Sequence, residues 1–158
     1  MKPRWVPRAA VLAIHEELLA EHGGSPGLLD EGGLESALAS PQNRLAYSEE
    51  STPGFFDLAA CYAFSLTRNH PFQDGNKRVA FTVAAAFLEM NGFSLGAPEA
   101  DAVKMVNALS TREIDEAVFA QWLRDNSSAI PKPKKSARPS PRSSLVAPAP
   151  RRRKARRR

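Results

Sequence analysis

The sequence predicts an all-α fold, in which a compact bundle of helices surrounds one buried central helix. Apolar residues recur at spacings of three, four and seven through most of residues 1–130, the pattern of helices that each bury one face. Helical periodicity outweighs strand-like alternation almost everywhere in this part of the chain. Residues 76–90 are apolar on nearly every side, as expected of a helix that its neighbours cover all round.

Charge divides the chain into two parts. Residues 1–130 hold 10 Lys/Arg and 17 Asp/Glu, a charge of −7, whereas residues 131–158 hold 12 Lys/Arg and no acid; −7 + 12 gives the net charge of +5. The second part is rich in Pro, Ser and Ala, and it has too few large apolar residues to offset the entropy cost of ordering. We therefore expect one globular domain, 1–130, and a disordered polybasic tail, 131–158.

Composition excludes several classes of protein. The single cysteine excludes a disulfide framework and suits a reducing cytoplasm, and three histidines leave little material for a zinc site. No apolar run approaches the roughly 20 residues that span a bilayer. The first apolar stretch is interrupted by His15, Glu16 and Glu17, so it does not resemble a signal peptide. We expect a cytoplasmic protein with no membrane segment.

The first helix is predicted over 6–20, and the glycine pair at 23–24 ends it. Asp30 is a suitable N-cap for a short second helix, which Pro41 should stop. Residues 42–54 lack helical spacing and end in a Pro-Gly pair. They are expected to form a loop or a short irregular hairpin.

Four further helices complete the predicted body, over 56–69, 76–90, 99–109 and 113–125. Cys61 lies among small and apolar residues and is expected to be a core residue. Trp5 and Trp122, near the two ends of the body, are expected to anchor the packing. His15 and His22 lie seven residues apart on the first helix. With no third ligand in sight, a structural role for these histidines is favoured over a metal site.

A turn-forming segment, 70–78, separates the two most apolar helices. Pro71 disfavours helical backbone at the residue before it, so the preceding helix should stop there. Asp74 and Gly75 favour a turn, and Asn76 is a natural N-cap for the buried helix. Two cations follow in the first helical turn, where the helix dipole already contributes about half a positive charge.

Lys77 and Arg78 at this helix N-terminus lack an obvious anionic partner, and phosphate groups would supply one. Asp74 is suited to hold Mg²⁺ bridged to those phosphates. His70, of a residue type that titrates near neutrality, could take a proton from an incoming hydroxyl. Phe72 is expected to point inward and pin the loop. Singly, a loop histidine or a solvated Lys-Arg pair would need no function; their concentration in one short segment favours a site.

The residues of this segment read His70-Pro71-Phe72-Gln73-Asp74-Gly75-Asn76-Lys77-Arg78. This string resembles the signature of the Fic/Doc superfamily, in particular of its death-on-curing (Doc) branch, the toxins of type II toxin–antitoxin systems. The resemblance extends over residues 5–125 and includes the shorter stretches 14–18, 23–27, 34–38 and 87–92. It implies a compact helical fold and an enzyme that transfers part of a nucleotide to a protein hydroxyl.

Two departures distinguish the branches of this superfamily. The adenylylating Fic branch reads HxFx(D/E)GNGRxxR, whereas here Lys77 replaces the second glycine and Phe81 stands where the second arginine should be. The Doc branch has that lysine and lacks that arginine. Resemblance to Doc implies a nucleotide bound turned round, with its γ-phosphate facing the base, and a phosphoprotein as product. A lysine also supplies the point charge that phosphoryl transfer needs.

The resemblance also implies a role for each residue of the signature. His70 would be the general base and Asp74 the Mg²⁺ ligand. The phosphates would be held by the remaining members, namely the Gly75 backbone, Asn76, Lys77 and Arg78. Residues 42–50 occupy the place of the family's flap, which aligns the target peptide by strand-like pairing. The chain departs from Doc mainly at Gly75, where Doc has alanine.

The function implied is that of a Doc-like toxin that transfers the γ-phosphate of Mg-ATP to a Ser or Thr hydroxyl of a cytoplasmic protein. The family's target is translation elongation factor Tu, so translation would be blocked. No inhibitory (S/T)xxxE(G/N) motif occurs in the chain, which favours a separate Phd-like antitoxin as partner. Two alternatives stay open: protein adenylylation by the same site, and a non-catalytic protein that binds nucleic acid or ribosomes through its basic tail.

Overall fold

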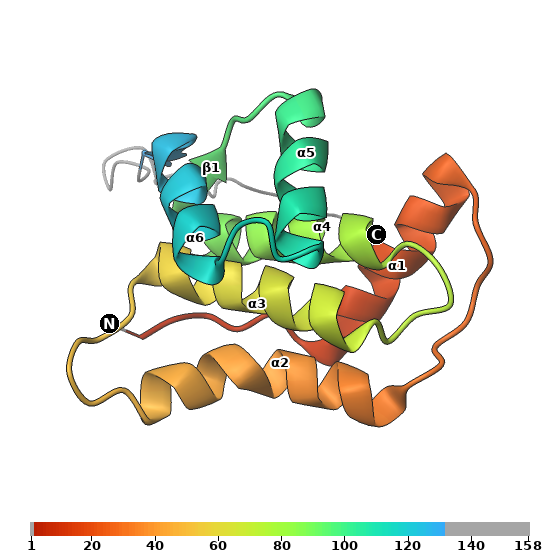
Figure 1. Ribbon diagram of the computed structural model, residues 1–158, viewed down its shortest axis with the longest axis horizontal. Coiled ribbons are helices and arrows are strands. Elements are labelled where there is room, and N and C mark those ends of the chain that lie inside the picture. The colour runs from red at the N-terminus through yellow and green to blue at the C-terminus, as the bar shows by residue number, and fades with distance from the viewer. Residues whose placement is uncertain (1, 132–158) are drawn as a thin grey trace, which may run out of the picture.

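The computed structural model of the protein describes residues 2–131 (Figure 1). The elements follow in the order α1 (Arg8–His22), α2 (Glu31–Ala46), α3 (Phe55–Asn69), α4 (Asn76–Met90), β1 (Phe93–Leu95), α5 (Glu99–Ser110), α6 (Glu116–Asp125) and β2 (Ser127–Ala129). The predicted all-α fold is confirmed. The predicted tail lies outside the described residues except for Pro131. None of the helices within residues 2–131 has the length and apolar character needed to cross a membrane.

Helices α3 and α4 lie side by side at the centre of the bundle. Figure 1 shows α2 against one side of α3, with α5 and α6 on the opposite side, and α1 packs on α4. The buried residues of α4 include Val79, Val83 and Phe87, and α3 is buried to a similar extent. The predicted central helix is therefore one of a central pair.

Aromatic side chains pack in two clusters, and each of the two tryptophans belongs to one of them, in agreement with their predicted role in packing. Trp5 stacks on Phe87, with ring centroids 5.7 Å apart, and Phe87 also contacts Tyr62. The Tyr62 hydroxyl accepts a hydrogen bond from the backbone N–H of Val6 at 3.1 Å. This bond ties the segment before α1 to α3. In the second cluster, Trp122 packs against two phenylalanine rings.

The second helix continues past Pro41 to Ala46, so the prediction that it stops at Pro41 was wrong. A proline inside a helix removes one backbone hydrogen bond and crowds the preceding turn. Tertiary contacts offset this cost: Pro41 is buried, and Leu45 packs against the core. In the last turn, Arg44 forms an ion pair with Glu116 of α6, at 2.9 Å.

Residues 42–54 contain no strand, and the two strands of the described chain, β1 and β2, pair with each other although α5 and α6 lie between them in sequence. The strands are antiparallel, with Phe93 opposite Ala129 and Leu95 opposite Ser127. Residues 42–46 are helical and residues 47–54 form an irregular connection. The predicted start of the last helix at Glu113 was also early. Asp115 accepts a hydrogen bond from the Val118 N–H and so caps the helix at 2.9 Å.

Replacing Glu116 by Gln is expected to make the protein more stable than the wild type at pH 7. Burial raises the pKa of the Glu116 carboxyl above its ordinary value of 4.5, and Arg44 opposes this effect only in part. The folded chain therefore binds the proton more tightly than the unfolded chain. Wild-type stability falls as the pH rises from 4.5 through the raised pKa, whereas Glu116→Gln has no such loss.

Thermal unfolding of both proteins between pH 4 and pH 8 measures this effect. The stability advantage of Glu116→Gln should grow with pH across that window and vanish below the ordinary glutamate value. A less stable Glu116→Gln at pH 7 would mean that the ion pair with Arg44 outweighs the burial of the carboxylate.

Candidate functional site

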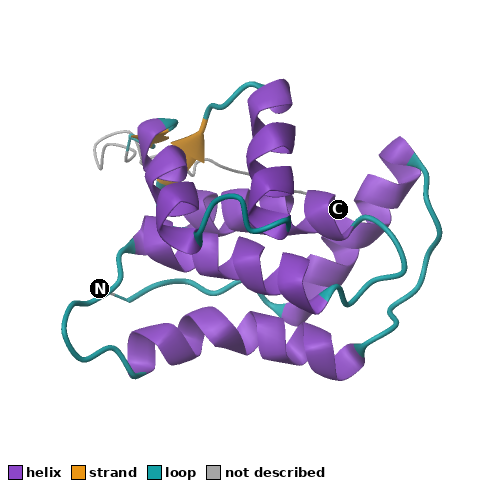
Figure 2. Cartoon of the chain, in the orientation of Figure 1, coloured by secondary structure: helices purple, strands orange, loops and turns teal. Residues whose placement is uncertain are grey.

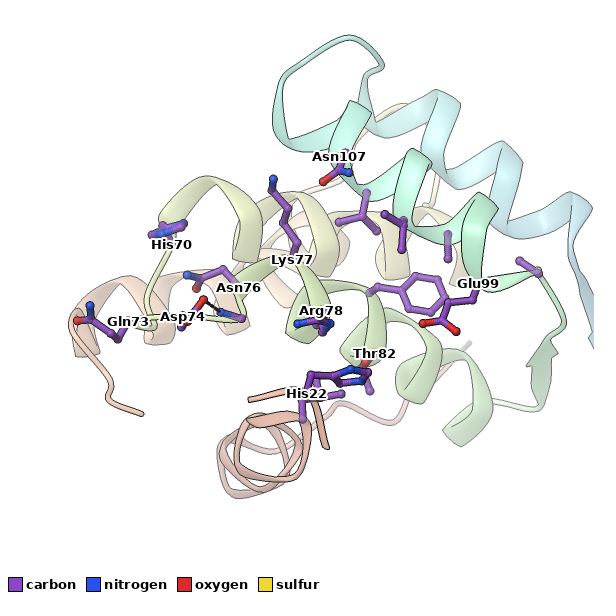
Figure 3. A pocket seen from close by; sticks show the side chains of 17 residues that line it. His22, His70, Gln73, Asp74, Asn76, Lys77, Arg78, Thr82, Glu99 and Asn107 are labelled. Atoms are coloured by element: carbon purple, nitrogen blue, oxygen red, sulfur yellow. Dashed lines mark hydrogen bonds between the residues drawn. The ribbon is translucent and has the colours of Figure 1, made fainter. Parts of the chain in front are cut away.

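The main cavity of the described chain lies between α1, α4, α5 and the loop that precedes α4. Its volume is about 620 Å³ (Figure 3). The residues predicted from the sequence to form a site all line it, namely His70, Asp74, Gly75, Asn76, Lys77 and Arg78. The structure thus brings the whole predicted set into one cavity.

Two residues with left-handed backbone conformations determine the shape of the loop. Helix α3 ends at Asn69, and His70 then adopts φ 48° and ψ 56°, because the following Pro71 disfavours continued helix. Gly75, the N-cap of α4, has φ 82° and ψ 15°, a conformation that glycine adopts without strain. For histidine this conformation is costly, and strain of this kind is concentrated at functional sites. Because the backbone turns at both of these residues, His70 lies at the same cavity as the N-terminus of α4.

The Asn76 side chain stabilises the loop through hydrogen bonds to the backbone of Phe72. Its Oδ1 accepts a hydrogen bond from the Phe72 N–H at 3.0 Å, and its Nδ2 donates to the Phe72 carbonyl at 2.9 Å. Asn76 is therefore the first residue of α4 and not its N-cap, which is Gly75. These two bonds hold the Asn76 side chain against the loop backbone, and the backbone N–H of Asn76 is among the free amides at the N-terminus of α4.

Replacing Asn76 by Asp is expected to destabilise the fold by about 2–3 kcal/mol. The carboxylate keeps the acceptor for the Phe72 N–H but sets an oxygen against the Phe72 carbonyl, in a position where the side chain is buried. Urea unfolding followed by circular dichroism gives the difference. Asn76→Ser, which removes the amide without adding a charge, is the control and should lose less. Equal losses would show that the buried carboxylate facing the Phe72 carbonyl costs nothing beyond the lost amide bonds.

The connection between α1 and α2 supports the loop from the other side, an arrangement that the sequence analysis missed. The Pro71 carbonyl accepts hydrogen bonds from the backbone N–H groups of Leu29 and Asp30, at 2.8 and 3.1 Å, and Gln73 donates to the Gly27 carbonyl at 2.9 Å. Figure 2 shows both connections at the same end of the molecule. The site loop is thus one edge of a short two-stranded contact.

His15 of α1 also contacts the loop, whereas the sequence indicated only a structural role. The His15 side chain is buried, and its ring stacks on the Phe72 ring, with centroids 3.9 Å apart and planes 18° apart. Its Nε2 lies 2.9 Å from the Asp74 carbonyl oxygen. Phe72 is only 1% exposed, which confirms that it points inward. The only sequence signal for the histidine contact was its place among apolar residues of α1.

The carboxylate of Asp74 is held by backbone groups. It accepts hydrogen bonds from the N–H of Ser25, at 3.2 Å, and from the N–H of Gly75, at 3.0 Å. A Cβ on Gly24 would lie 3.0 Å from its Oδ2 and 2.9 Å from Leu19, so only glycine permits this close approach. The carboxylate is consequently fixed at the edge of the cavity.

Asp74 fits a magnesium ion that is shared with phosphates. Residues 2–131 contain no group of three or more metal-ligating side chains, so a self-sufficient metal cage is absent from this part of the chain. Mg²⁺ bound with a nucleotide needs only one or two carboxylates, because phosphates and water complete its shell. A single fixed carboxylate beside an anion site matches that requirement.

Positive potential is concentrated at the start of α4. The first intrahelical bond runs from the Val79 N–H to the Gly75 carbonyl, so the amides before Val79 keep the free donors of a helix N-terminus. Lys77 and Arg78 are exposed, and neither forms an ion pair with another described residue. In Figure 3 Lys77 extends on the side of Asn107 and Arg78 on the side of His22. The cavity therefore has cations on both flanks of a helix N-terminus.

The wall opposite the loop is mostly apolar and was not predicted as part of the site. Phe81 of α4 lies beside residues of α5 that include Val103 and Val106, and Glu99 and Asn107 add polar groups there. Phe81 had been singled out only because it replaces an arginine of the Fic pattern. The cavity combines a basic end at the start of α4 with an apolar end beside α5.

These observations define a class of protein: a small helical domain that builds a basic cavity at the N-terminus of a central helix, with a histidine beside it. Comparison with known sequences supports this assignment to a class. A sequence model of the Fic/DOC family matches residues 5–88, more than half of the chain. The chain belongs to the Fic/DOC family, and its relatives place it in the death-on-curing branch.

Two relatives show how far the similarity extends. The chain is 32% identical over 122 residues to the protein of Escherichia phage P1 named protein kinase doc, which covers 77% of this chain and 94% of the relative. It is 40% identical over 95 residues to the toxin Doc of Mycolicibacterium smegmatis, which covers 59% of this chain and 72% of the relative. The predicted membership of the Doc-type toxins is confirmed.

Proposed function

We propose that this protein is a toxin that transfers the γ-phosphate of ATP to a Ser or Thr hydroxyl of a cytoplasmic protein, with elongation factor Tu as the expected target. The observation that supports this proposal most directly is the single cavity shared by His70, the free N-terminus of α4, Lys77 and Arg78. A relative named protein kinase doc supports the type of reaction.

The chemistry follows from the groups in the cavity. His70 takes the proton of the target hydroxyl as its oxygen attacks the γ-phosphorus. The bond between that phosphorus and the bridging oxygen of ADP breaks, and ADP leaves with the electron pair. The amides of α4, Lys77 and Arg78 hold the oxygens of the transferred group, since positioning and charge neutralisation dominate phosphoryl transfer. Asp74 would hold Mg²⁺, which neutralises phosphate charge when bound with the nucleotide.

Lys77 and Phe81 favour phosphate transfer over adenylylation. Lys77 lines the cavity where the adenylylating pattern has a glycine, so its side chain takes space and adds charge at that point. Phe81 packs against Trp122, with ring centroids 6.4 Å apart, and presents an apolar edge where the adenylylating pattern has an arginine. The polyphosphate therefore finds its cations at the loop end of the cavity and none at Phe81.

A toxin of this kind requires a cognate antitoxin, and we propose a small Phd-like protein as the partner. Both relatives belong to the Doc branch, and one of them is named a toxin. The polybasic residues 132–158 lie beyond the described part of the chain and have no place in this proposal.

The deciding experiment is a labelling reaction with the purified full chain, purified elongation factor Tu or bacterial extract, and Mg²⁺. γ-labelled and α-labelled ATP are used in parallel. Label from γ-labelled ATP alone is expected on a protein of elongation-factor size. Label from α-labelled ATP would replace the kinase by an adenylyltransferase. Absence of label in both, with nucleic acid retained by the full chain and lost on deletion of residues 132–158, would favour the tail-dependent alternative.

A further inference from the structure

The contact between His15 and the Asp74 carbonyl suggests a task beyond packing. We propose that His15 is a positioning residue, which fixes the orientation of the Asp74–Gly75 peptide so that its carbonyl oxygen points away from the cavity that receives phosphate. This inference rests on the proposed function in one respect, that the anion bound in the cavity is the phosphate chain of a nucleotide.

The geometry of His15 is that of a buried donor aimed at one acceptor. His15 is only 6% exposed, whereas its neighbours Glu16 and Glu17 are exposed. It does not line the cavity, although Asp74 and Gly75 do. The carbonyl oxygen of Asp74, 2.9 Å from Nε2, is therefore turned toward the protein interior.

The direction of this hydrogen bond is fixed by chemistry. A backbone carbonyl oxygen only accepts, so the proton must be on Nε2 of His15. The ring is packed on the Phe72 ring, with centroids 3.9 Å apart, and the backbone of Phe72 is itself held by two hydrogen bonds to Asn76. The donor is thus held at its position by packing that is independent of the bond it makes.

The peptide that His15 holds is one that could otherwise rotate. A peptide unit is planar, so turning its carbonyl also turns its N–H. Gly75 adopts φ 82°, and glycine places few limits on such a rotation. If the Asp74–Gly75 peptide were reversed, the carbonyl oxygen would face the phosphate and repel it. The Gly75 N–H would also leave the Asp74 carboxylate, to which it donates at 3.0 Å.

A matched pair of substitutions separates the donor from the packing. Gln at position 15 can place an amide N–H near the position of Nε2, whereas Met has nearly the same length and no donor. We expect His15→Met to raise KM for Mg-ATP about tenfold, the size of one net hydrogen bond, with little change in kcat, because phosphate is held equally before and during transfer. His15→Gln should stay near the wild type. His15→Phe, which keeps an aromatic ring, should resemble His15→Met.

A second measurement requires neither nucleotide nor activity. Amide hydrogen exchange of the free full-length protein, followed by NMR at Gly75, should be about tenfold faster in His15→Met and His15→Phe than in the wild type and His15→Gln. The melting temperature of each variant shows whether it is folded. Should one donor-less variant fail to fold, the other still tests the inference against His15→Gln.

Each outcome has a defined meaning. Equal behaviour of His15→Met and His15→Gln in both measurements, or wild-type behaviour of His15→Phe, would overturn the inference and leave His15 as a packing residue. If the wild type neither binds nor uses Mg-ATP, the proposed function fails, and hydrogen exchange at Gly75 still decides whether His15 fixes the peptide.

Discussion

Replacing His70 by alanine is expected to lower the rate of phosphate transfer by roughly 10²- to 10⁴-fold, the usual contribution of a general base. His70 is exposed, and its side chain makes no hydrogen bond to another described residue. Its removal therefore takes little from the fold. Nucleotide affinity should also change little, because the phosphate-binding groups come from α4. The expected result is a fall in kcat with KM for Mg-ATP nearly unchanged.

The left-handed backbone at this position determines the choice of control. At φ 48°, alanine adds strain that asparagine, which tolerates this conformation, avoids. His70→Asn therefore removes the base with the least disturbance of the loop. Steady-state rates with elongation factor Tu should fall to a similar extent in both variants. A His70→Asn protein that kept most of the wild-type kcat would show that the hydroxyl loses its proton to another group.

Replacing Phe72 by alanine is expected to destabilise the protein by about 3–5 kcal/mol, the range for deleting a buried phenylalanine. Phe72 is 1% exposed and stacks on His15, so the variant would leave a void between α1 and the site loop. The residue also carries both backbone bonds to Asn76. Loss of stability should therefore be accompanied by loss of loop geometry.

Urea unfolding measures the change in the free energy of unfolding. Phe72→Leu, which keeps most of the apolar volume, is the control and should cost clearly less. Substrate turnover by the folded fraction should fall in Phe72→Ala even at temperatures where the variant is native. A loss below about 1 kcal/mol would contradict this account, since it would mean that His15 and the neighbouring residues move into the void and fill it.

The helices could be predicted because each one buries a periodic face. One of the two most apolar helices, 76–90, was located with both of its bounds, and Pro71 marked the end of the helix before it. The prediction failed at Pro41, where a local rule was outweighed by the burial of Pro41 and by the packing of Leu45 against the core. Local propensity is a weak guide wherever tertiary packing opposes it.

The site residues also divide into those that a local sequence rule predicted and those that only tertiary contacts determine. Lys77 and Arg78 were predictable because cations at a helix N-terminus violate a local electrostatic preference, and the structure places both at the cavity. The groups that support the loop violate no such local preference, so the sequence did not indicate them. His15 lies 59 residues from Asp74 along the chain, and the bonds between Pro71 and the α1–α2 connection are made by backbone atoms. None of these contacts follows a periodicity of the sequence, and the backbone bonds depend on no particular side chain.

The pairing of the α1–α2 connection with the loop before α4 makes the site a joint product of two halves of the chain. The connection at 47–54, which is exposed over residues 47–52, separates them: His15, Gly27 and Leu29 lie before it, and the signature residues lie after it. A backbone cut in that connection would leave each half with an incomplete site. Activity should then return only when the halves reassemble through the contact between α2 and α3, so a split form of this toxin would act as a switch controlled by association.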